Sequence, residues 1–267
     1  MKILFTDLDG TLLNNESKVS KGTKAFLDDF LRAGNKLVLS SGRPLDSILE
    51  VKELAGLTAP GILVIASNGT LVYDCDRKAI ISEKRMPFSY VSHLQKEAEA
   101  MGMHIQTYTR DAIVCRTEDE EIRYYRQKIH LPLILADDYA SALTTEPYKM
   151  LVIELHNHDK LLAFCDRIAE WAKDKIQYIF SNGMYLELFV KEAGKGSAVS
   201  FVCEYFGTPV SDSYAAGDAD NDISMLQAAG CGIAMANASP NVKEAADIVT
   251  RLDNDKDGLA KCMRELF

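Results

Sequence analysis

The sequence predicts an α/β core with a doubly wound, Rossmann-like, mostly parallel sheet, interrupted by an inserted α+β domain. Two observations predict this fold. Short apolar runs alternate with amphipathic helical segments toward both ends of the chain, which is typical of βαβ units. From about residue 86 this alternation gives way to paired strand-like runs. We therefore expect residues 1–83 and 187–267 to form the core and residues 84–186 to form the inserted domain.

The first part of the chain alternates strands and helices. The predicted elements are a strand at 2–6, a helix at 20–33, a strand at 36–40, a helix at 44–55 and a strand at 61–66. Ser20 can cap the first helix, and Pro44 is suited to start the second. Asn68-Gly69 then favours a tight turn into a hairpin partner at 70–74.

The middle and last parts of the chain complete the prediction. In the middle we expect a helix at 90–101, strands at 104–109 and 111–117, a helix at 118–130, a strand at 150–155, a helix at 159–174, and strands at 176–180 and 184–190. The βαβ pattern then returns with a helix at 196–206, a strand at 213–217, a helix at 220–229, an apolar run at 231–236 and a helix at 257–266.

The composition excludes several classes of protein. The chain has 47% hydrophobic and 26% charged residues, as ordinary globular proteins do, and a net charge of -9. Such an acidic chain repels nucleic acid, so an anionic ligand would need local positive groups. No apolar run is long enough to span a bilayer, and six scattered cysteines favour a reducing compartment. We expect a cytoplasmic protein with no membrane, nucleic-acid or obligate protein partner.

The first candidate motif is Asp7-Leu8-Asp9-Gly10-Thr11, directly after the first predicted strand. Open α/β sheets bind ligands at the carboxyl ends of their strands. Two aspartates separated by one residue can converge there on a hard cation such as Mg²⁺, which prefers oxygen ligands. Taken alone, the motif also fits an acidic turn or a calcium loop.

Three further polar clusters follow strands or begin helices. They are Ser40-Ser41-Gly42-Arg43-Pro44, Lys195-Gly196-Ser197, and Gly217-Asp218-Ala219-Asp220-Asn221-Asp222. The first could bind an anion with its hydroxyls and free amides, and the second supplies a positive charge for phosphate. Asp218 of the third could complete a metal site. Each cluster alone has an ordinary reading as a helix cap, a solvated lysine or an acidic helix start.

Together these residues resemble the four motifs of the haloacid dehalogenase superfamily, in the same order along the chain. The DxDGT motif is Asp7 to Thr11, the S/T-G-R motif begins at Ser41, the lysine motif is Lys195, and the GDxxND motif is Gly217 to Asp222. The SGRP, NG and NDKDG elements and the long insert resemble the Cof-type branch with a type-IIB cap domain.

This resemblance implies a set of residue roles. Mg²⁺ would be held by the carboxylates of Asp7 and Asp218 and the backbone carbonyl of Asp9. Asp7 would attack phosphorus, and Asp9 would act as general acid and base. Asp222 would orient Lys195 or the metal. The phosphoryl group would be bound by the Leu8 amide, Ser41, the Gly42 amide, Lys195 and Asn221.

The resemblance further implies a phosphatase acting on small phosphorylated metabolites, with sugar phosphates first. Two alternatives stay open: a phosphosugar mutase, and a non-catalytic phosphate-binding regulatory domain. Two local questions also stay open. Arg43 could reach the substrate or pair with a nearby acid, and Asn68-Gly69 could be a simple hairpin turn or lie near the site entrance.

Overall fold

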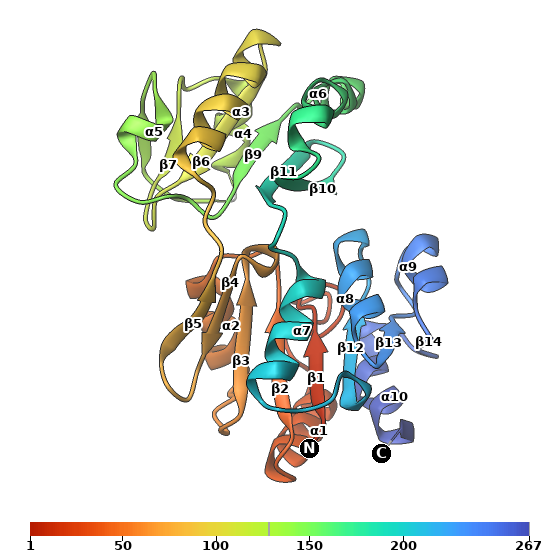
Figure 1. Ribbon diagram of the computed structural model, residues 1–267. Helices are drawn as coiled ribbons and strands as arrows, with labels where there is room; N and C mark the ends of the chain where they lie inside the picture. Colours follow the sequence, from red (N-terminus) through yellow and green to blue (C-terminus); the bar gives the residue numbers. More distant parts are fainter. Residues whose placement is uncertain (128, 267) are drawn as a thin grey trace. The chain divides into compact units, whose positions relative to one another are not determined.

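The computed structural model describes residues 1–127 and 129–266 and divides into two compact units (Figure 1). The first unit contains residues 1–83 and the chain from 193 onward, and the second contains residues 84–192. Lys128 and Phe267, which fall within the predicted helix at 118–130 and the predicted core segment, lie outside the described residues.

An eight-stranded sheet forms the centre of the first unit, in the order β14-β13-β12-β1-β2-β3-β4-β5. The strands are β1 (Ile3–Thr6), β2 (Lys36–Ser40), β3 (Ile62–Ala66), β4 (Leu71–Asp74), β5 (Ala79–Glu83), β12 (Ser213–Gly217), β13 (Cys231–Ala234) and β14 (Ile248–Val249). Pairing is parallel from β14 to β3, and β4 and β5 add antiparallel. The predicted α/β core is confirmed.

The central strands are buried because they are apolar on both faces. Ile3, Leu4 and Phe5 of β1 are completely buried, as expected for a parallel strand covered by helices on both sides. The chain leaves this buried strand at Asp7. β1 pairs with β2 on one side and with β12 on the other, so the residues that follow these three strands meet at one edge of the sheet.

Helices connect the strands of this unit. They are α1 (Lys21–Arg32), α2 (Leu45–Leu54), α7 (Lys195–Tyr205), α8 (Ile223–Ala228), α9 (Pro240–Ala245) and α10 (Gly258–Leu266). Ser20 caps α1, as predicted, by accepting a hydrogen bond from Thr23 N at 3.1 Å. β5, α9 and β14 were not predicted from the sequence, since elements of two to six residues carry little periodicity.

The second unit is a six-stranded sheet with helices, in the strand order β10-β11-β9-β6-β7-β8. Its strands are β6 (His104–Tyr108), β7 (Ile113–Cys115), β8 (Leu133–Leu135), β9 (Met150–Ile153), β10 (Ile176–Asn182) and β11 (Tyr185–Val190). Its helices are α3 (Phe88–Ala100), α4 (Glu120–Tyr125), α5 (Tyr139–Ala142) and α6 (His158–Ala172). All pairings are antiparallel except that of β7 with β8.

Three details of the second unit differ from the sequence-based expectation. α4 ends at Tyr125, and β8 and α5 lie between residues 131 and 149, where the sequence predicted no helix or strand. The boundary expected at residue 187 falls inside β11, which pairs with β9 and belongs to the second unit. In the described part of the chain, no helix is both long and apolar enough to cross a membrane.

Candidate active site

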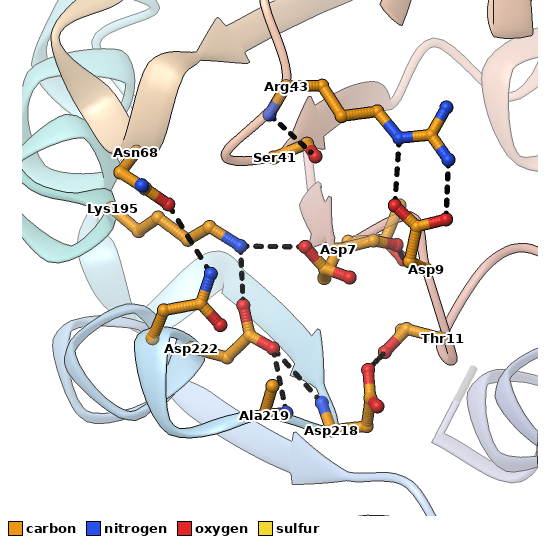
Figure 2. A network of polar contacts seen from close by, with 12 residues as sticks. Asp7, Asp9, Thr11, Ser41, Arg43, Asn68, Lys195, Asp218, Ala219 and Asp222 are labelled. Carbon is orange, nitrogen blue, oxygen red and sulfur yellow. Dashed lines mark hydrogen bonds and ion pairs between the residues drawn. The ribbon is translucent and has the colours of Figure 1, made fainter. Parts of the chain in front are cut away.

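One edge of the core sheet gathers the polar clusters singled out in the sequence (Figure 2). Asp7 follows β1, Ser41 follows β2, and Asp218 follows β12. Lys195 is the first residue of α7. Parallel pairing of β1 with β2 and β12 brings these loops together although the residues are far apart in the sequence.

Lys195 is the centre of a buried charge network. Its Nζ donates to Asp7 Oδ1 at 2.7 Å and to Asp222 Oδ1 at 2.6 Å. Lys195 is 2% exposed and Asp222 is fully buried. Burial alone would lower the pKa of the ammonium, but the Asp222 and Asp7 carboxylates outweigh that effect and raise the pKa above its usual value. The lysine therefore carries its charge throughout the neutral range.

Asp222 also fixes the loop after β12. Its second oxygen, Oδ2, accepts hydrogen bonds from the backbone amides of Asp218 and Ala219, both at 3.1 Å. A Cβ at Gly217 would lie 2.4 Å from Asp222 Cβ, so only glycine fits there. Both Asp222 oxygens thus have protein partners, and this carboxylate orients Lys195 and the Asp218 backbone.

Asp218 reaches across to the loop after β1. Its Oδ1 accepts a hydrogen bond from the Thr11 hydroxyl at 2.7 Å. Gly10 has φ +80°, and a Cβ there would lie 2.3 Å from Asp218 Oδ2. Leu8, which lies between Asp7 and Asp9 in the sequence, buries its side chain in the core. The glycine is therefore needed both for the turn and for the close approach of Asp218.

The three carboxylates of this network suit a cation. One oxygen from each of Asp7, Asp218 and Asp222 lies within 4.8 Å of the others. Burial raises the pKa of Asp7, although the Lys195 ammonium lowers it, and burial raises that of Asp218 to about 6. When all three carboxylates are ionised, they and the one ammonium leave two negative charges uncompensated, which a divalent cation would neutralise. Because Asp222 is already engaged, Asp7 and Asp218 are the available carboxylate ligands.

Asp9 lies apart from the buried network. Its side chain is 56% exposed. Arg43 binds it with two hydrogen bonds, Nε to Oδ2 at 2.8 Å and Nη2 to Oδ1 at 2.6 Å. This two-pronged pair is the strongest geometry for a guanidinium and a carboxylate. Of the two roles left open for Arg43, the structure shows pairing with a nearby acid.

Ser41 and Asn221 meet at Asn68, whose role the sequence left open. The backbone amide of Asn68 donates to Ser41 O at 3.1 Å. Asn221 Nδ2 donates to Asn68 Oδ1 at 3.3 Å. Asn68 and Gly69 do connect two antiparallel strands, β3 and β4, as predicted for a hairpin. The Asn68 side chain is also buried within the site, because β3 ends at the same sheet edge.

Comparisons with known proteins agree with this geometry. A family model described as haloacid dehalogenase-like hydrolase matches residues 4–263. Phosphatase YwpJ of Bacillus subtilis is 28% identical over 293 residues, and the match covers 100% of both chains. A haloacid dehalogenase-like hydrolase from Bacteroides thetaiotaomicron superposes with a TM-score of 0.84 at 29% identity, over 100% of this chain and 99% of that one.

A third likeness extends to the inserted unit. A subclass IIB sugar phosphatase superposes with a TM-score of 0.80 over 100% of this chain and 99% of that chain. At 23% sequence identity, this likeness shows a shared fold and nothing about the substrate. The resemblance drawn from the four sequence motifs is confirmed.

Proposed function

The chain belongs to the haloacid dehalogenase-like hydrolases, and from that premise we propose that it is a Mg²⁺-dependent phosphatase of small phosphate esters. The reaction would pass through a phosphorylated Asp7. The observation that carries the proposal is the buried contact of Asp7 with Lys195, itself held by Asp222. A carboxylate beside a fixed positive charge is what a nucleophile of this kind would need.

We assign the metal to the carboxylates of Asp7 and Asp218 and the backbone carbonyl of Asp9. The support is the oxygen chemistry of the cluster and its two uncompensated negative charges. A bound Mg²⁺ would supply positive charge to the oxygens of the transferring phosphoryl group. Asp222 would act from behind, by orienting Lys195 and the Asp218 backbone.

The chemistry proceeds in two displacements. A carboxylate oxygen of Asp7 forms a bond to phosphorus as the ester oxygen leaves, and Asp9 donates a proton to that oxygen. Asp9 then takes a proton from a water molecule as the water oxygen attacks phosphorus. The bond between phosphorus and Asp7 breaks, which releases inorganic phosphate and restores the carboxylate. Asp9 must leave Arg43 to exchange protons, and its exposed position permits this movement.

Fixed donors would hold the phosphoryl group during both displacements. We assign this role to the Leu8 amide, the Ser41 hydroxyl, the Gly42 amide, Lys195 and Asn221. Ser41 is 3% exposed and Lys195 is 2% exposed, so these donors are already ordered before substrate arrives. Preorganised donors of this kind contribute most of the rate enhancement in phosphoryl transfer, with one donor worth about 3 kcal/mol.

The substrate we propose is a phosphorylated metabolite, with sugar phosphates tested first. This choice rests on the sequence resemblance, and the fold that the chain shares with a sugar phosphatase agrees with it. A phosphosugar mutase would return the phosphoryl group to the sugar instead of passing it to water. Isomer formation measured against phosphate release separates these two reactions.

The test is phosphate release from a panel of phosphorylated sugars, nucleotides and cofactors, with Mg²⁺ or with chelator. We expect release that needs Mg²⁺ and falls at least about 1,000-fold in Asp7→Asn. Asp28→Asn is the matched control, because Asp28 lies on α1 and pairs with Lys24. Full activity in Asp7→Asn would refute the nucleophile. No turnover of any compound, including an aryl phosphate, would favour a phosphate-binding domain.

A further inference from the structure

The short turn after β3 has an unusual backbone. Ser67, Asn68 and Gly69 form a 3-10 turn in which all three φ angles are positive, at 48°, 58° and 94°. All three residues are buried. Two consecutive residues other than glycine in this region are uncommon, and such conformations persist where the surroundings hold them in place. A hairpin connection alone would be served as well by glycine.

This turn holds the loop that follows β2. Asn68 N donates to Ser41 O at 3.1 Å, and Ser67 N donates to Arg43 O at 2.9 Å. A Cβ built on Gly42 would lie 3.0 Å from Asn68 Oδ1. The Asn68 side chain therefore lies directly against the glycine whose amide we assign to the phosphoryl group.

The same turn meets the residue before Lys195. A Cβ on Gly69 would lie 2.3 Å from the carbonyl carbon of Gly194, so the two backbones are in close contact. Gly194 itself has φ +145° and precedes the first residue of α7. The turn thus also packs against the segment that brings Lys195 into the site.

The third contact is made by the Asn68 side chain. Its Oδ1 accepts the hydrogen bond from Asn221 Nδ2 at 3.3 Å. An amide side chain can point its oxygen or its nitrogen at a ligand, and only the nitrogen donates to a phosphate oxygen. An amide nitrogen carries two hydrogens, so with one donated to Asn68 Oδ1 the other can donate to a phosphate oxygen.

We propose that Asn68 is a positioning residue for phosphoryl transfer: it orients the Asn221 amide and holds the Ser41–Gly42 loop against the site. The proposal deepens the phosphatase function and rests on it. Asn68 touches the phosphate-binding groups and acts through them. Asparagine is suited to the position because it tolerates the left-handed conformation better than other residues with a side-chain acceptor.

The first test is Asn68→Gly, which keeps the backbone conformation and removes only the side chain. We expect a fall of roughly tenfold in kcat/KM, equal to about 1.4 kcal/mol of transition-state stabilisation. Inorganic phosphate should bind more weakly by a similar factor. Lys78→Gly is the control, since Lys78 is exposed in the β4–β5 turn with φ 52°. It should leave activity and phosphate binding unchanged.

A double-mutant cycle separates positioning from a purely structural role. If Asn68 acts through Asn221, then Asn68→Gly should add little to the loss already caused by Asn221→Ala. Thermal unfolding of each variant shows whether it is folded at the assay temperature. Full additivity, or wild-type activity and phosphate binding in Asn68→Gly, would overturn the proposal.

The proposal and the phosphatase function can fail separately. If the wild-type chain hydrolyses no ester but binds inorganic phosphate with Mg²⁺, the phosphatase function is refuted, and calorimetric phosphate binding still measures the cycle. If hydrolysis is normal and the cycle is additive, only the role of Asn68 is refuted. If neither hydrolysis nor phosphate binding occurs, both are refuted.

Discussion

The two units each bury a lysine against a carboxylate, with different consequences. In the core, Lys195 contacts Asp7 and Asp222 at 2.7 and 2.6 Å. In the inserted unit, Lys149 contacts Glu187 at 2.6 Å, with side chains 14% and 10% exposed. Lys149 and Glu187 carry one opposite charge each. The core network has an excess of carboxylates at the sheet edge, as the proposed metal and nucleophile roles require.

The sharpest way to break this comparison is to remove each lysine. Lys195→Met would take away the charge that we assign to phosphate binding and leave the buried Asp7 and Asp222 carboxylates without a cationic partner. We expect kcat to fall roughly 100- to 1,000-fold, with a stability loss of about 3–5 kcal/mol. Lys149→Met should destabilise its unit by a similar mechanism while folded molecules keep activity within a few-fold. Activity per folded molecule, measured beside calorimetric unfolding, checks both expectations.

Either of two outcomes would contradict this view. If folded Lys149→Met lost as much kcat as Lys195→Met, the inserted unit would share in the chemistry. If Lys195→Met kept its activity, the positive charge would not serve the phosphoryl group.

Metal binding should affect the units unequally. At a Mg²⁺ concentration 100 times its Kd, the core should gain about 2.7 kcal/mol in its free energy of unfolding. Asp218→Asn should abolish this gain. The single tryptophan, Trp171, lies in α6, so its fluorescence follows the inserted unit and should shift less. Calorimetry and fluorescence with and without chelator test this. If Mg²⁺ stabilised Asp218→Asn as much as it stabilises wild type, Asp218 would be excluded as a ligand.

Arg43 sharpens the distinction between the buried and the exposed parts of the core site. Arg43→Gln removes both hydrogen bonds to Asp9, which is then no longer held beside the site between proton transfers. We expect kcat to fall roughly tenfold for alkyl phosphates, which need a proton donor. The fall should be smaller for aryl phosphates, whose leaving groups need less help. Arg43→Lys should restore little, since an ammonium cannot make the two-pronged contact. Equal losses with both substrates would argue against this role.

We expect the smallest effect at Asp257, a carboxylate that contributes to stability and not to activity. Hydrogen bonds from the Ser20 hydroxyl and from Thr23 at the start of α1 lower the pKa of Asp257. A depressed pKa stabilises the fold above the unfolded value of about 3.9, and the benefit is lost as the pH falls through the folded pKa. Asp257→Asn should therefore destabilise the protein by up to about 1 kcal/mol at pH 7.

This difference from wild type should shrink below pH 4, and activity at pH 7 should not change. Denaturant unfolding across pH 3–8 measures it. A difference that stays constant with pH would show that the Asp257 charge is not involved.

The fold of the core and the grouping of its candidate site residues could be predicted from the sequence, because these residues lie in short motifs. Asp7, Ser41 and Asp218 each follow a parallel strand, and strand polarity alone places them at one edge. Lys195 was identifiable from its motif, and the resemblance implied that Asp222 would orient either Lys195 or the metal; the sequence could not decide that Asp222 contacts Lys195. That contact depends on how α7 packs, which is a tertiary property.

Short elements and contacts between distant residues could not be predicted from the sequence. β8, α5 and β14 have between two and four residues, too few to show a period. The sequence could not decide between a hairpin turn and a site contact at Asn68, because both use the same residues. Arg43 and Asp9 are 34 residues apart in the sequence. A contact of Arg43 with the substrate and a pair with a nearby acid therefore fitted the sequence equally well.

The most direct test of the central claim is to trap phosphorylated Asp7. Enzyme quenched during turnover with Mg²⁺ and substrate is treated with borohydride, which reduces an acyl phosphate to an alcohol, and the peptides are analysed by mass. We predict that Asp7 is converted to homoserine only when both substrate and Mg²⁺ are present. Conversion at another aspartate or glutamate during normal turnover would contradict Asp7 as the nucleophile.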